Sequence, residues 1–570
     1  CCFSFGGRGI HNEDFSSAAQ VLTELFDGGG TLDIVFTDVV AAAMAIAFEQ
    51  EDRQRKHMER LKREADGDPN SLALLQQAAT SNNAVPIIGH HLEAILSVTL
   101  GRNIETGMTS TGVSPTPTPN THRRKDRDMT LVFVKNPLND EQFAVRELLS
   151  PEIDVDRYAI AEGARFLRYS IAINAAKGYI FGNPSANCCK LTYARCCELP
   201  KHRQQEREGI IVGDGSAGLD EAALMKVIGF DTSKAELLYA HLVNAVGQAV
   251  YCIVVDHVWE SVVLCIRGSL SLEDYVVNLQ IDAEKLDAVG AEYGFDGEGE
   301  YCHKGYLARA KWVCEDLKRH QILQNVLNKE TGKYRDYSLR VSGHSLGAGT
   351  AAPVALMLRS RYPNLRCLCF APPGGLFSEG IAARSKDFVS TYVHADDVVP
   401  RISTQAIEKL RDEALQMIAR IKVPKCQLMR IHRSGKKLGE LTVGLEDLLH
   451  PIDAIPDCEF KAQLERFKQR QRVIKTARVH LHLPGRIVHL VREISGQEQR
   501  NFHQGRFQLG NIFHFATCDL FVAEEKYTPR YAAPSDFDDI VVSSKLVSDH
   551  MVETVEVALN FAAEAFGVDP

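Results

Sequence analysis

The stretch that decides the fold lies at residues 341–349 and reads Val-Ser-Gly-His-Ser-Leu-Gly-Ala-Gly. It contains the pattern G-x-S-x-G, with Gly343, Ser345 and Gly347 at its fixed positions. A short β-type run precedes it, and small residues that can open a helix follow it. A serine on a tight strand-to-helix turn is forced outward at the end of a sheet, and glycines beside it let strand and helix approach closely. The stretch therefore predicts a nucleophile at Ser345.

Strand-like and helical segments alternate on both sides of this turn. Apolar β-type runs occur at 251–255, 262–266, 339–341, 367–370, 389–393, 427–431 and 487–491. Helical stretches separate several of them, at 304–328, 347–360, 377–386 and 403–421. Near-continuous apolar strands alternating with helices indicate an α/β fold with a mostly parallel sheet that helices cover on both faces. We predict that this catalytic domain spans residues 227–570.

The chain before residue 227 has a different character. Residues 1–128 combine a helical segment with a flexible linker that is rich in proline and threonine and then basic. Residues 129–226 form a helical lead-in that continues into a cysteine-rich, then basic loop at 188–208. We therefore expect an N-terminal helical extension ahead of the α/β domain.

Composition limits the compartment and the partners. The formal net charge of −9 argues against a nucleic-acid partner. The fifteen cysteines show no framework spacing, so we expect mostly reduced thiols in a cytosolic setting. The cluster at 188–197 lacks the C-x-x-C spacing of a zinc site, and acylation next to a membrane is the better alternative. We predict neither a metal nor a cofactor, and calcium dependence stays open.

No transmembrane segment or secretory signal is visible in the sequence. The most apolar stretch, at 34–48, is too short to span a bilayer and carries Asp38. The chain begins with Cys1 rather than methionine, so we expect a fragment or a processed form. A membrane anchor upstream of Cys1 would not be visible.

A serine nucleophile needs a base, and the base needs an orienting acid. In α/β-hydrolases the three follow in the order serine, acid, histidine, each on a loop after a strand. The segment at 391–401 follows a β-type run and offers two carboxylates, Asp396 and Asp397. We predict Asp397 as the acid and keep Asp396 as the alternative.

Eight histidines follow Asp397 in the sequence: His432, His450, His480, His482, His489, His503, His514 and His550. The β-like surroundings of His480, His482 and His489 suit packing better than catalysis. His550 instead stands where a polar loop meets the helix expected at 551–561, and such a junction can present a side chain to the end of the sheet. We predict His550 as the general base.

The tetrahedral intermediate of an ester or amide cleavage needs hydrogen-bond donors for its oxyanion. One donor is the backbone N–H of Leu346, which directly follows the nucleophile. The second should come from the loop after an earlier strand, and Ser269 can offer its backbone N–H and its hydroxyl. Loss of one such donor costs about 3 kcal/mol of transition-state stabilisation.

At this point the residues resemble the fungal-type class 3 lipases, and more closely the sn-1-specific diacylglycerol lipases. The similarity rests on 266–269, 303–305, 341–350, 370–376, 397–401, 484–490 and 549–551. The resemblance implies an α/β-hydrolase fold with Ser345 as nucleophile, Asp397 as acid and His550 as base. It favours Asp397 because the family's acid directly precedes the element that reads Val-Val-Pro-Arg here.

The resemblance also implies cleavage of the sn-1 ester of diacylglycerol to 2-monoacylglycerol and a fatty acid. It implies a membrane domain that this chain lacks, a lid at 271–301, and an insertion at 432–483 that is not similar in sequence to the family's. Two alternatives stay open. The first is an enzyme of the same fold with another substrate, either a triacylglycerol lipase or a phospholipase or galactolipase A1. The second is a catalytically silent membrane scaffold.

A lipid substrate requires contact with a membrane surface. Residues 466–478 carry six basic side chains and no acid: Arg466, Lys468, Arg470, Arg472, Lys475 and Arg478. Apolar residues are interleaved with them, which suits an anionic membrane at roughly 1 kcal/mol per basic residue. A solvated helix face is the equal alternative. We expect the chain at the cytoplasmic face of a membrane, with an undetermined oligomeric state.

Overall fold

The structure is a computed structural model. It describes residues 148–174, 184–200, 210–213, 218–243, 248–268, 283–433, 444–455, 460–466, 479–493, 526–541 and 545–569, with most of 41–52. Its centre is a nine-stranded sheet in the order β1-β2-β3-β4-β7-β8-β9-β10-β11. The strands are β1 (Ile210–Val212), β2 (Ala235–His241), β3 (Tyr251–Asp256), β4 (Ser261–Ile266), β7 (Ser338–His344), β8 (Arg366–Phe370), β9 (Val389–His394), β10 (Arg486–Glu493) and β11 (Lys526–Ala532).

Neighbouring strands from β4 to β10 run parallel, so their carboxyl ends meet at one edge of the sheet. Antiparallel pairs join β2, β3 and β4 on one side and β10 and β11 on the other. A separate antiparallel pair is formed by β5 (Ala283–Lys285) and β6 (Tyr301–His303). The predicted α/β-hydrolase architecture with a mostly parallel sheet is confirmed.

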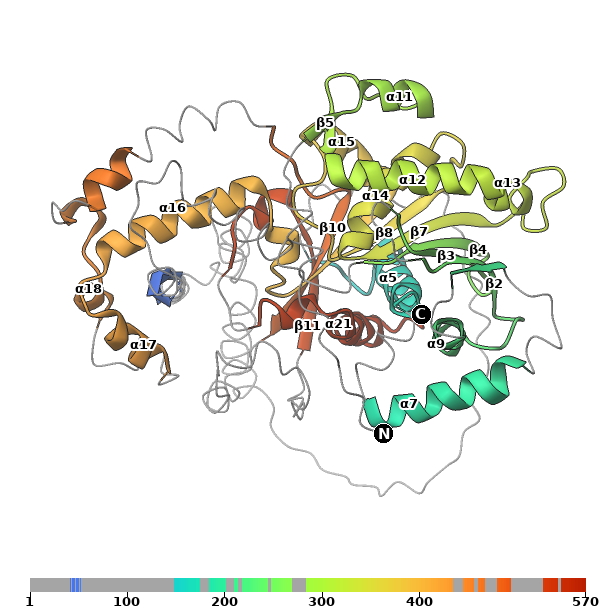
Figure 1. Ribbon diagram of the computed structural model, residues 1–570, viewed down its shortest axis with the longest axis horizontal. Coiled ribbons are helices and arrows are strands. Elements are labelled where there is room, and N and C mark those ends of the chain that lie inside the picture. The colour runs from blue at the N-terminus through green and yellow to red at the C-terminus, as the bar shows by residue number, and fades with distance from the viewer. Residues whose placement is uncertain are drawn as a thin grey trace, which may run out of the picture.

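Helices cover both faces of this sheet (Figure 1). One face carries α5 (Asp154–Ala172), α9 (Leu219–Ile228) and α21 (Val552–Ala565). The other carries α12 (Lys304–His320) and α14 (Leu346–Leu358), with α11 (Asp287–Tyr293), α13 (Ile322–Val326) and α15 (Glu379–Arg384) nearby. The expected helical stretches at 304–328, 347–360 and 377–386 thus correspond to observed helices.

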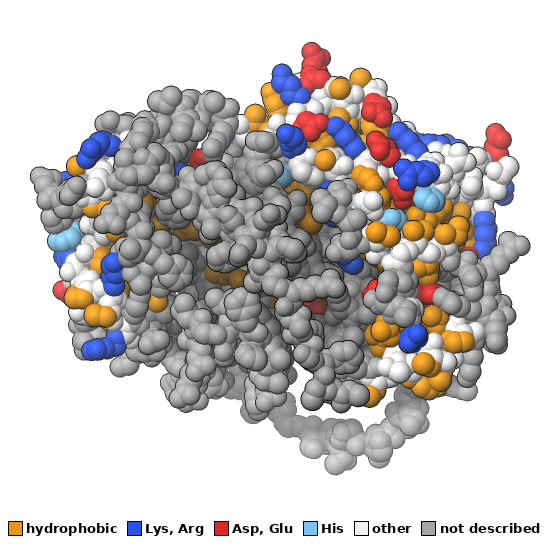
Figure 2. All heavy atoms as spheres, viewed as in Figure 1, with side chains coloured by type: hydrophobic (Ala, Val, Ile, Leu, Met, Phe, Trp, Pro, Cys, Tyr) orange, Lys and Arg blue, Asp and Glu red, His pale blue; other side chains and the backbone are white. Residues whose placement is uncertain are grey.

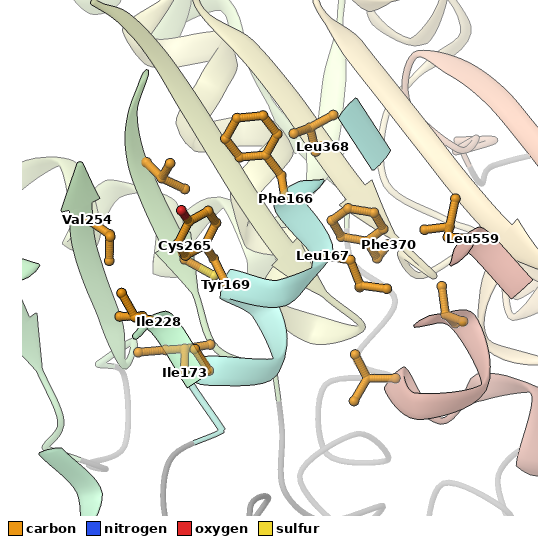
Figure 3. Close-up of a cluster of buried hydrophobic side chains, with 14 of the residues drawn as sticks. Phe166, Leu167, Tyr169, Ile173, Ile228, Val254, Cys265, Leu368, Phe370 and Leu559 are labelled. Carbon is orange, nitrogen blue, oxygen red and sulfur yellow. The ribbon is translucent and has the colours of Figure 1, made fainter. Parts of the chain in front are cut away.

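The strands are apolar on both sides because successive side chains enter opposite cores. In β4, Val263 and Cys265 belong to the core beneath α5, whereas Val262 and Leu264 belong to the core beneath α14. Figure 3 shows Phe166, Leu167 and Tyr169 of α5 facing the side chains of Val254, Cys265 and Leu368. Full burial of one such large apolar side chain stabilises the fold by about 1.5–3 kcal/mol.

The prediction of a strand at 427–431 is wrong, because the structure has a helix there, α17 (Lys425–Arg433). It follows Pro424, and only one side of it is covered. Leu428 is buried and Ile431 packs beside it, three positions later, whereas Gln427 and Arg430 are exposed. A spacing of three residues between covered positions is typical of a helix. The sequence alone did not reveal it, because a short apolar run is equally compatible with a strand.

α17 belongs to a helical lobe beside the sheet. It packs with α16 (Thr404–Arg420), α18 (Leu445–Leu448) and the helical residues of 41–52 around a small core that includes Phe48, Met417 and Leu448. Arg420 Nη1 donates to Glu49 Oε2 at 2.8 Å. The described residues of 41–52 are therefore helical, as the sequence predicted, and they contact a helix that lies more than 350 positions further along the chain.

The cysteine-rich segment is also helical rather than a loop. It forms α7 (Pro184–Tyr193) and continues as a π-helical turn, η3 (Ala194–Glu198). Leu191, Ala194 and Leu199 enter the core beneath α5, while Cys189 and Cys196 are exposed free thiols. The cysteine-rich composition favours a loop in the sequence, but a cysteine does not break a helix.

The packed unit also begins before residue 227. The parallel pair of β1 with β2 and the packing of α5 and α9 on the sheet place residues upstream of 227 inside the same core. The predicted start at 227 is therefore too late.

Among the described residues, no helix combines the length and apolar character that crossing a bilayer requires.

A buried ion-pair cluster joins α5 to the centre of the sheet. Glu162 Oε1 accepts from Arg340 Nε of β7 at 2.9 Å and from Arg366 Nε of β8 at 2.8 Å. The Glu162 side chain has no exposed area, and those of Arg340 and Arg366 are nearly buried. Burial alone would raise the pKa of Glu162, but the charges of Arg366 and Arg340 outweigh burial and lower it.

We expect Glu162→Gln to lower the free energy of unfolding by about 3–5 kcal/mol, because two arginines would stay buried without their carboxylate. The measurement is urea unfolding at pH 7. Since the pKa of Glu162 is lowered in the fold, its contribution is present above the ordinary glutamate pKa and is lost as the pH falls through the lowered value. The difference between wild type and variant should therefore shrink in acid.

The exposed Glu152 just before α5 provides the control. Glu152→Gln should change the unfolding free energy by less than about 0.5 kcal/mol. Equal effects of the two substitutions would show that the cluster does not hold α5 on the sheet.

Candidate active site

Ser345 stands on a tight turn between β7 and α14. Its φ of 58° and ψ of −127° lie in a region that residues other than glycine rarely adopt. A Cβ atom at Gly343 would lie 2.5 Å from the backbone carbon of Gly347, and one at Gly347 would lie 2.2 Å from the Ile266 carbonyl oxygen. Both positions are thus closed to any side chain by neighbouring backbone. The Ser345 N–H donates to the Phe370 carbonyl oxygen of β8 at 2.9 Å and ties the turn to the sheet.

The structure brings Ser345, His550 and Asp397 into one chain of hydrogen bonds. Ser345 Oγ lies 2.8 Å from His550 Nε2, and His550 Nδ1 lies 3.0 Å from each carboxylate oxygen of Asp397. Ser345 is 7% exposed and Asp397 is fully buried. The three side chains come from three loops at the carboxyl edge of the sheet: after β7, after β9 and before α21.

The partners of His550 determine its tautomer. A carboxylate can only accept a hydrogen bond, so Nδ1 carries the proton and donates a hydrogen bond to Asp397. Nε2 then holds a lone pair toward Ser345 Oγ, whose hydroxyl donates to it. One oxygen of Asp397 also accepts from the Val399 N–H at 2.9 Å, which fixes the carboxylate. The arrangement can remove a proton from the Ser345 hydroxyl.

The structure separates the two adjacent carboxylates. Asp397 faces His550, whereas Asp396 has a partly exposed side chain and contributes its backbone N–H to Asp549 Oδ2 at 3.1 Å. Asp397, which the sequence predicts as the acid, is the carboxylate in contact with His550, and its catalytic role stays a prediction.

His344 occupies the x position before Ser345 in the G-x-S-x-G pattern, and it contacts His550 directly. Its ring stacks on the ring of His550 with 4.9 Å between centroids, and its Nε2 lies 2.9 Å from the His550 carbonyl oxygen. A carbonyl only accepts, so His344 Nε2 is the donor. Burial, and after it the nearby His550, lowers the pKa of His344 to about 3, which keeps this imidazole neutral at physiological pH.

The predicted oxyanion donors are only partly described. Leu346 is the first residue of α14, where a backbone N–H has no acceptor within its own helix. Ser269 lies outside the described residues. Gly268 precedes it and touches the turn, because a Cβ there would lie 2.7 Å from the His344 carbonyl oxygen. The chain therefore passes against the turn of Ser345 at Gly268.

The other predicted surface features lie mostly outside the described residues. Of the basic residues at 466–478, Arg466 is exposed at the end of a described helical segment, and Lys468, Arg470, Arg472, Lys475 and Arg478 are not described. The first part of the expected lid, 271–282, is not described either. Figure 2 shows acidic and basic side chains intermixed over α11 and α12, where Lys311 pairs with Glu284 at 2.7 Å.

The sequence assigned three histidines to packing, and the structure supports this only in part. His489 lies buried in β10, His482 is half-buried in an isolated bridge with Phe377, and His480 is exposed. His489 Nε2 also donates to the Ala395 carbonyl oxygen at 2.9 Å, beside the loop of Asp397. The sequence did not predict this support, nor the contact of His344 with His550, because neither is local in the chain.

Comparison with known proteins gives a consistent result. Residues 263–407 match the family model described as Lipase (class 3), a range that contains Ser345 and Asp397. Diacylglycerol lipase-alpha of Rattus norvegicus is 26% identical over 411 residues, which make up 70% of this chain and 36% of that protein. Diacylglycerol lipase-beta of Mus musculus is 27% identical over 401 residues, 67% of this chain and 53% of that protein. The chain thus spans between a third and about half the length of these relatives.

Solved structures of fungal lipases are similar over smaller parts of the chain. Mono- and diacylglycerol lipase from Aspergillus oryzae is 17% identical, with a TM-score of 0.29 over 44% of this chain and 76% of that one. The lipase of Rhizopus microsporus var. chinensis is 18% identical, with a TM-score of 0.27 over 39% of this chain and 71% of that one. Residues 263–407 thus match the class 3 lipase model within an α/β-hydrolase fold, and the chain is similar to the diacylglycerol lipases.

Proposed function

We propose that this chain is a serine hydrolase that cleaves the sn-1 acyl ester of diacylglycerol into 2-monoacylglycerol and a fatty acid. The observation that carries the proposal is the hydrogen-bonded sequence Asp397–His550–Ser345 at the carboxyl edge of a class 3 lipase domain. The link between Ser345 and His550 has the geometry that proton transfer requires, and the link to Asp397 orients the imidazole.

In the first half-reaction, Ser345 Oγ attacks the ester carbonyl carbon while His550 Nε2 accepts the hydroxyl proton. The carboxylate of Asp397 stabilises the imidazolium that forms. The developing oxyanion receives hydrogen bonds from the Leu346 N–H and from Ser269. When the tetrahedral intermediate collapses, His550 returns its proton to the glyceride oxygen, which leaves as the alcohol of 2-monoacylglycerol.

The second half-reaction releases the acyl group from Ser345. A water molecule gives its proton to His550 Nε2 and attacks the acyl carbonyl carbon. The second intermediate collapses with return of the proton to Ser345 Oγ, and the fatty acid leaves. No group beyond water and these side chains takes part in the proposed cycle.

Diacylglycerol is favoured over other lipids by the relatives. Proteins named diacylglycerol lipase match about two thirds of the chain, and a secreted mono- and diacylglycerol lipase of Penicillium camembertii is 29% identical over 157 residues. Triacylglycerol, phospholipid and galactolipid are the competing substrates, since the same Ser345 chemistry would cleave their esters.

We further propose that the enzyme acts at the cytoplasmic face of a membrane. Diacylglycerol resides in the bilayer, and the basic residues of 466–478 would approach anionic lipid head groups. The exposed free thiols of Cys189 and Cys196 fit a reducing compartment.

Ser345→Ala should lower the hydrolysis of 1,2-dioleoyl-sn-glycerol at least about 10⁴-fold, because no other group replaces the nucleophile. The measurement is the release of 2-monoacylglycerol and oleate from mixed micelles, with triolein, phosphatidylcholine and a galactolipid as parallel substrates. Circular dichroism checks that the variant is folded.

Preference for another lipid in this panel would contradict the diacylglycerol assignment and leave the hydrolase intact. A fluorophosphonate probe tests the remaining alternative, a catalytically silent scaffold. Absence of labelling of wild type at Ser345, under conditions that label a fungal lipase, would favour the scaffold.

Asp397→Asn should lower kcat by about 10³- to 10⁴-fold, because an amide leaves the imidazolium without its charge partner and disturbs the tautomer. Asp396→Asn should lower kcat by less than about tenfold, since its partly exposed carboxylate does not contact His550. Initial rates on a soluble short-chain ester measure both. Losses of similar size, or the reverse order, would reassign the acid.

A further inference from the structure

The proposed acid and base lie on two loops that are far apart in the sequence, so the covalent backbone does not keep them close. Asp397 and His550 are 153 positions apart, and their loops follow β9 and precede α21. The geometry of His550 therefore depends on noncovalent contacts between the two loops. A displacement of about 1 Å at a catalytic group can cost about 10²-fold in rate.

Asp549, the residue before His550, makes contacts with both loops and with the sheet. Its Oδ2 accepts from the backbone N–H of Asp396 at 3.1 Å, in the loop of Asp397. Its Oδ1 accepts from Arg492 Nη2 of β10 in a close ion pair. The Asp549 side chain is 2% exposed, so both contacts lie away from water, where they are worth more than at the surface.

The backbone around His550 is held at two successive carbonyl oxygens. His394 Nδ1, at the end of β9, donates to the Asp549 carbonyl oxygen at 3.0 Å. His344 Nε2, at the end of β7, donates to the His550 carbonyl oxygen at 2.9 Å. Two strands of the sheet thus each present one imidazole to this short segment.

Both imidazoles act as neutral donors. Burial lowers the pKa of His394, although Asp549 acts in the opposite direction, and burial also lowers that of His344. A neutral ring carries a single N–H, which for His394 is on Nδ1. Its Nε2 is buried with no hydrogen-bond partner among the described residues, so a proton there would be costly.

We propose that Asp549 is a positioning residue, whose carboxylate joins Arg492 of β10 to the acid loop and thereby holds His550 in line with Ser345 and Asp397. The inference rests on the proposed function, since it concerns the base of that reaction. Asp549 itself does not contact the reacting atoms. Its effect reaches them through the position of the His550 imidazole.

The main test uses Asp549→Asn in the full chain. The amide oxygen can still accept from the Asp396 N–H, but the ion pair with Arg492 is lost. We expect kcat on a soluble short-chain ester to fall about 10- to 100-fold, with KM changed less than about twofold. A residue that only stabilises the fold would lower the thermal midpoint and leave kcat of the folded protein unchanged, and that result would overturn the proposal.

A second readout does not depend on any substrate. In protein labelled with ¹⁵N-histidine, the proton on His550 Nδ1 that is bonded to Asp397 gives a strongly downfield resonance, which Asp397→Asn identifies by its loss. We expect Asp549→Asn to shift or broaden this resonance. An unchanged resonance together with unchanged kcat would refute the positioning role.

The readouts also separate this proposal from the proposed function. If wild type cleaved no ester but the resonance moved in Asp549→Asn, the function would fail and the positioning role would stand. If Asp549→Asn did not fold, Arg492→Gln would give the same measurements, since it removes the charge and keeps a donor for the carboxylate. Glu553→Gln is the matched control, because Glu553 is an exposed carboxylate four positions later, and it should behave as wild type.

Discussion

The fold around the site depends on how closely three stretches of backbone approach one another at Ser345. The end of β7, the start of α14 and the chain after β4 meet there without room for a side chain at Gly343, Gly347 or Gly268. This contact forces Ser345 into its rare backbone conformation, with its hydroxyl directed toward His550. It also places Gly268 against the turn of Ser345. The position of the Ser345 side chain thus follows from one steric constraint.

The sheet provides the rigid frame for this turn. Side chains of its parallel strands enter two cores, and the buried charge of Glu162 ties α5 to β7 and β8. Because the parallel strands end at one edge, the loops after β7 and β9 lie together, and α21 brings His550 to the same place. Neutral imidazoles at the ends of β7 and β9 donate to the backbone carbonyls of His550 and Asp549, so that the position of the proposed base depends on contacts with the sheet.

Much of the architecture could be predicted from local pattern. Apolar runs such as 262–266 and 367–370 identified strands that are buried on both faces, and the small residues after Ser345 identified α14. The errors arose where local pattern is ambiguous. The run at 427–431 is short and contains three apolar residues, so it cannot be assigned by period alone, and a small core outside the sheet accepts Leu428 and Ile431 at helical spacing. The sequence predicts a loop at 188–208, although its first part is helical and Leu191 and Ala194 bury one side of that helix.

The sequence by itself determined the tight turn at Ser345. It also placed the aspartate and histidine candidates in loops that follow or precede a regular element. These properties are local, since they depend on glycine sterics and on hydrophobic period. Only the tertiary structure decided that Asp397 rather than Asp396 faces His550, and that His344, His394 and Asp549 surround the base. Those contacts join residues far apart in the chain, and their direction depends on how the strand ends and loops pack in three dimensions.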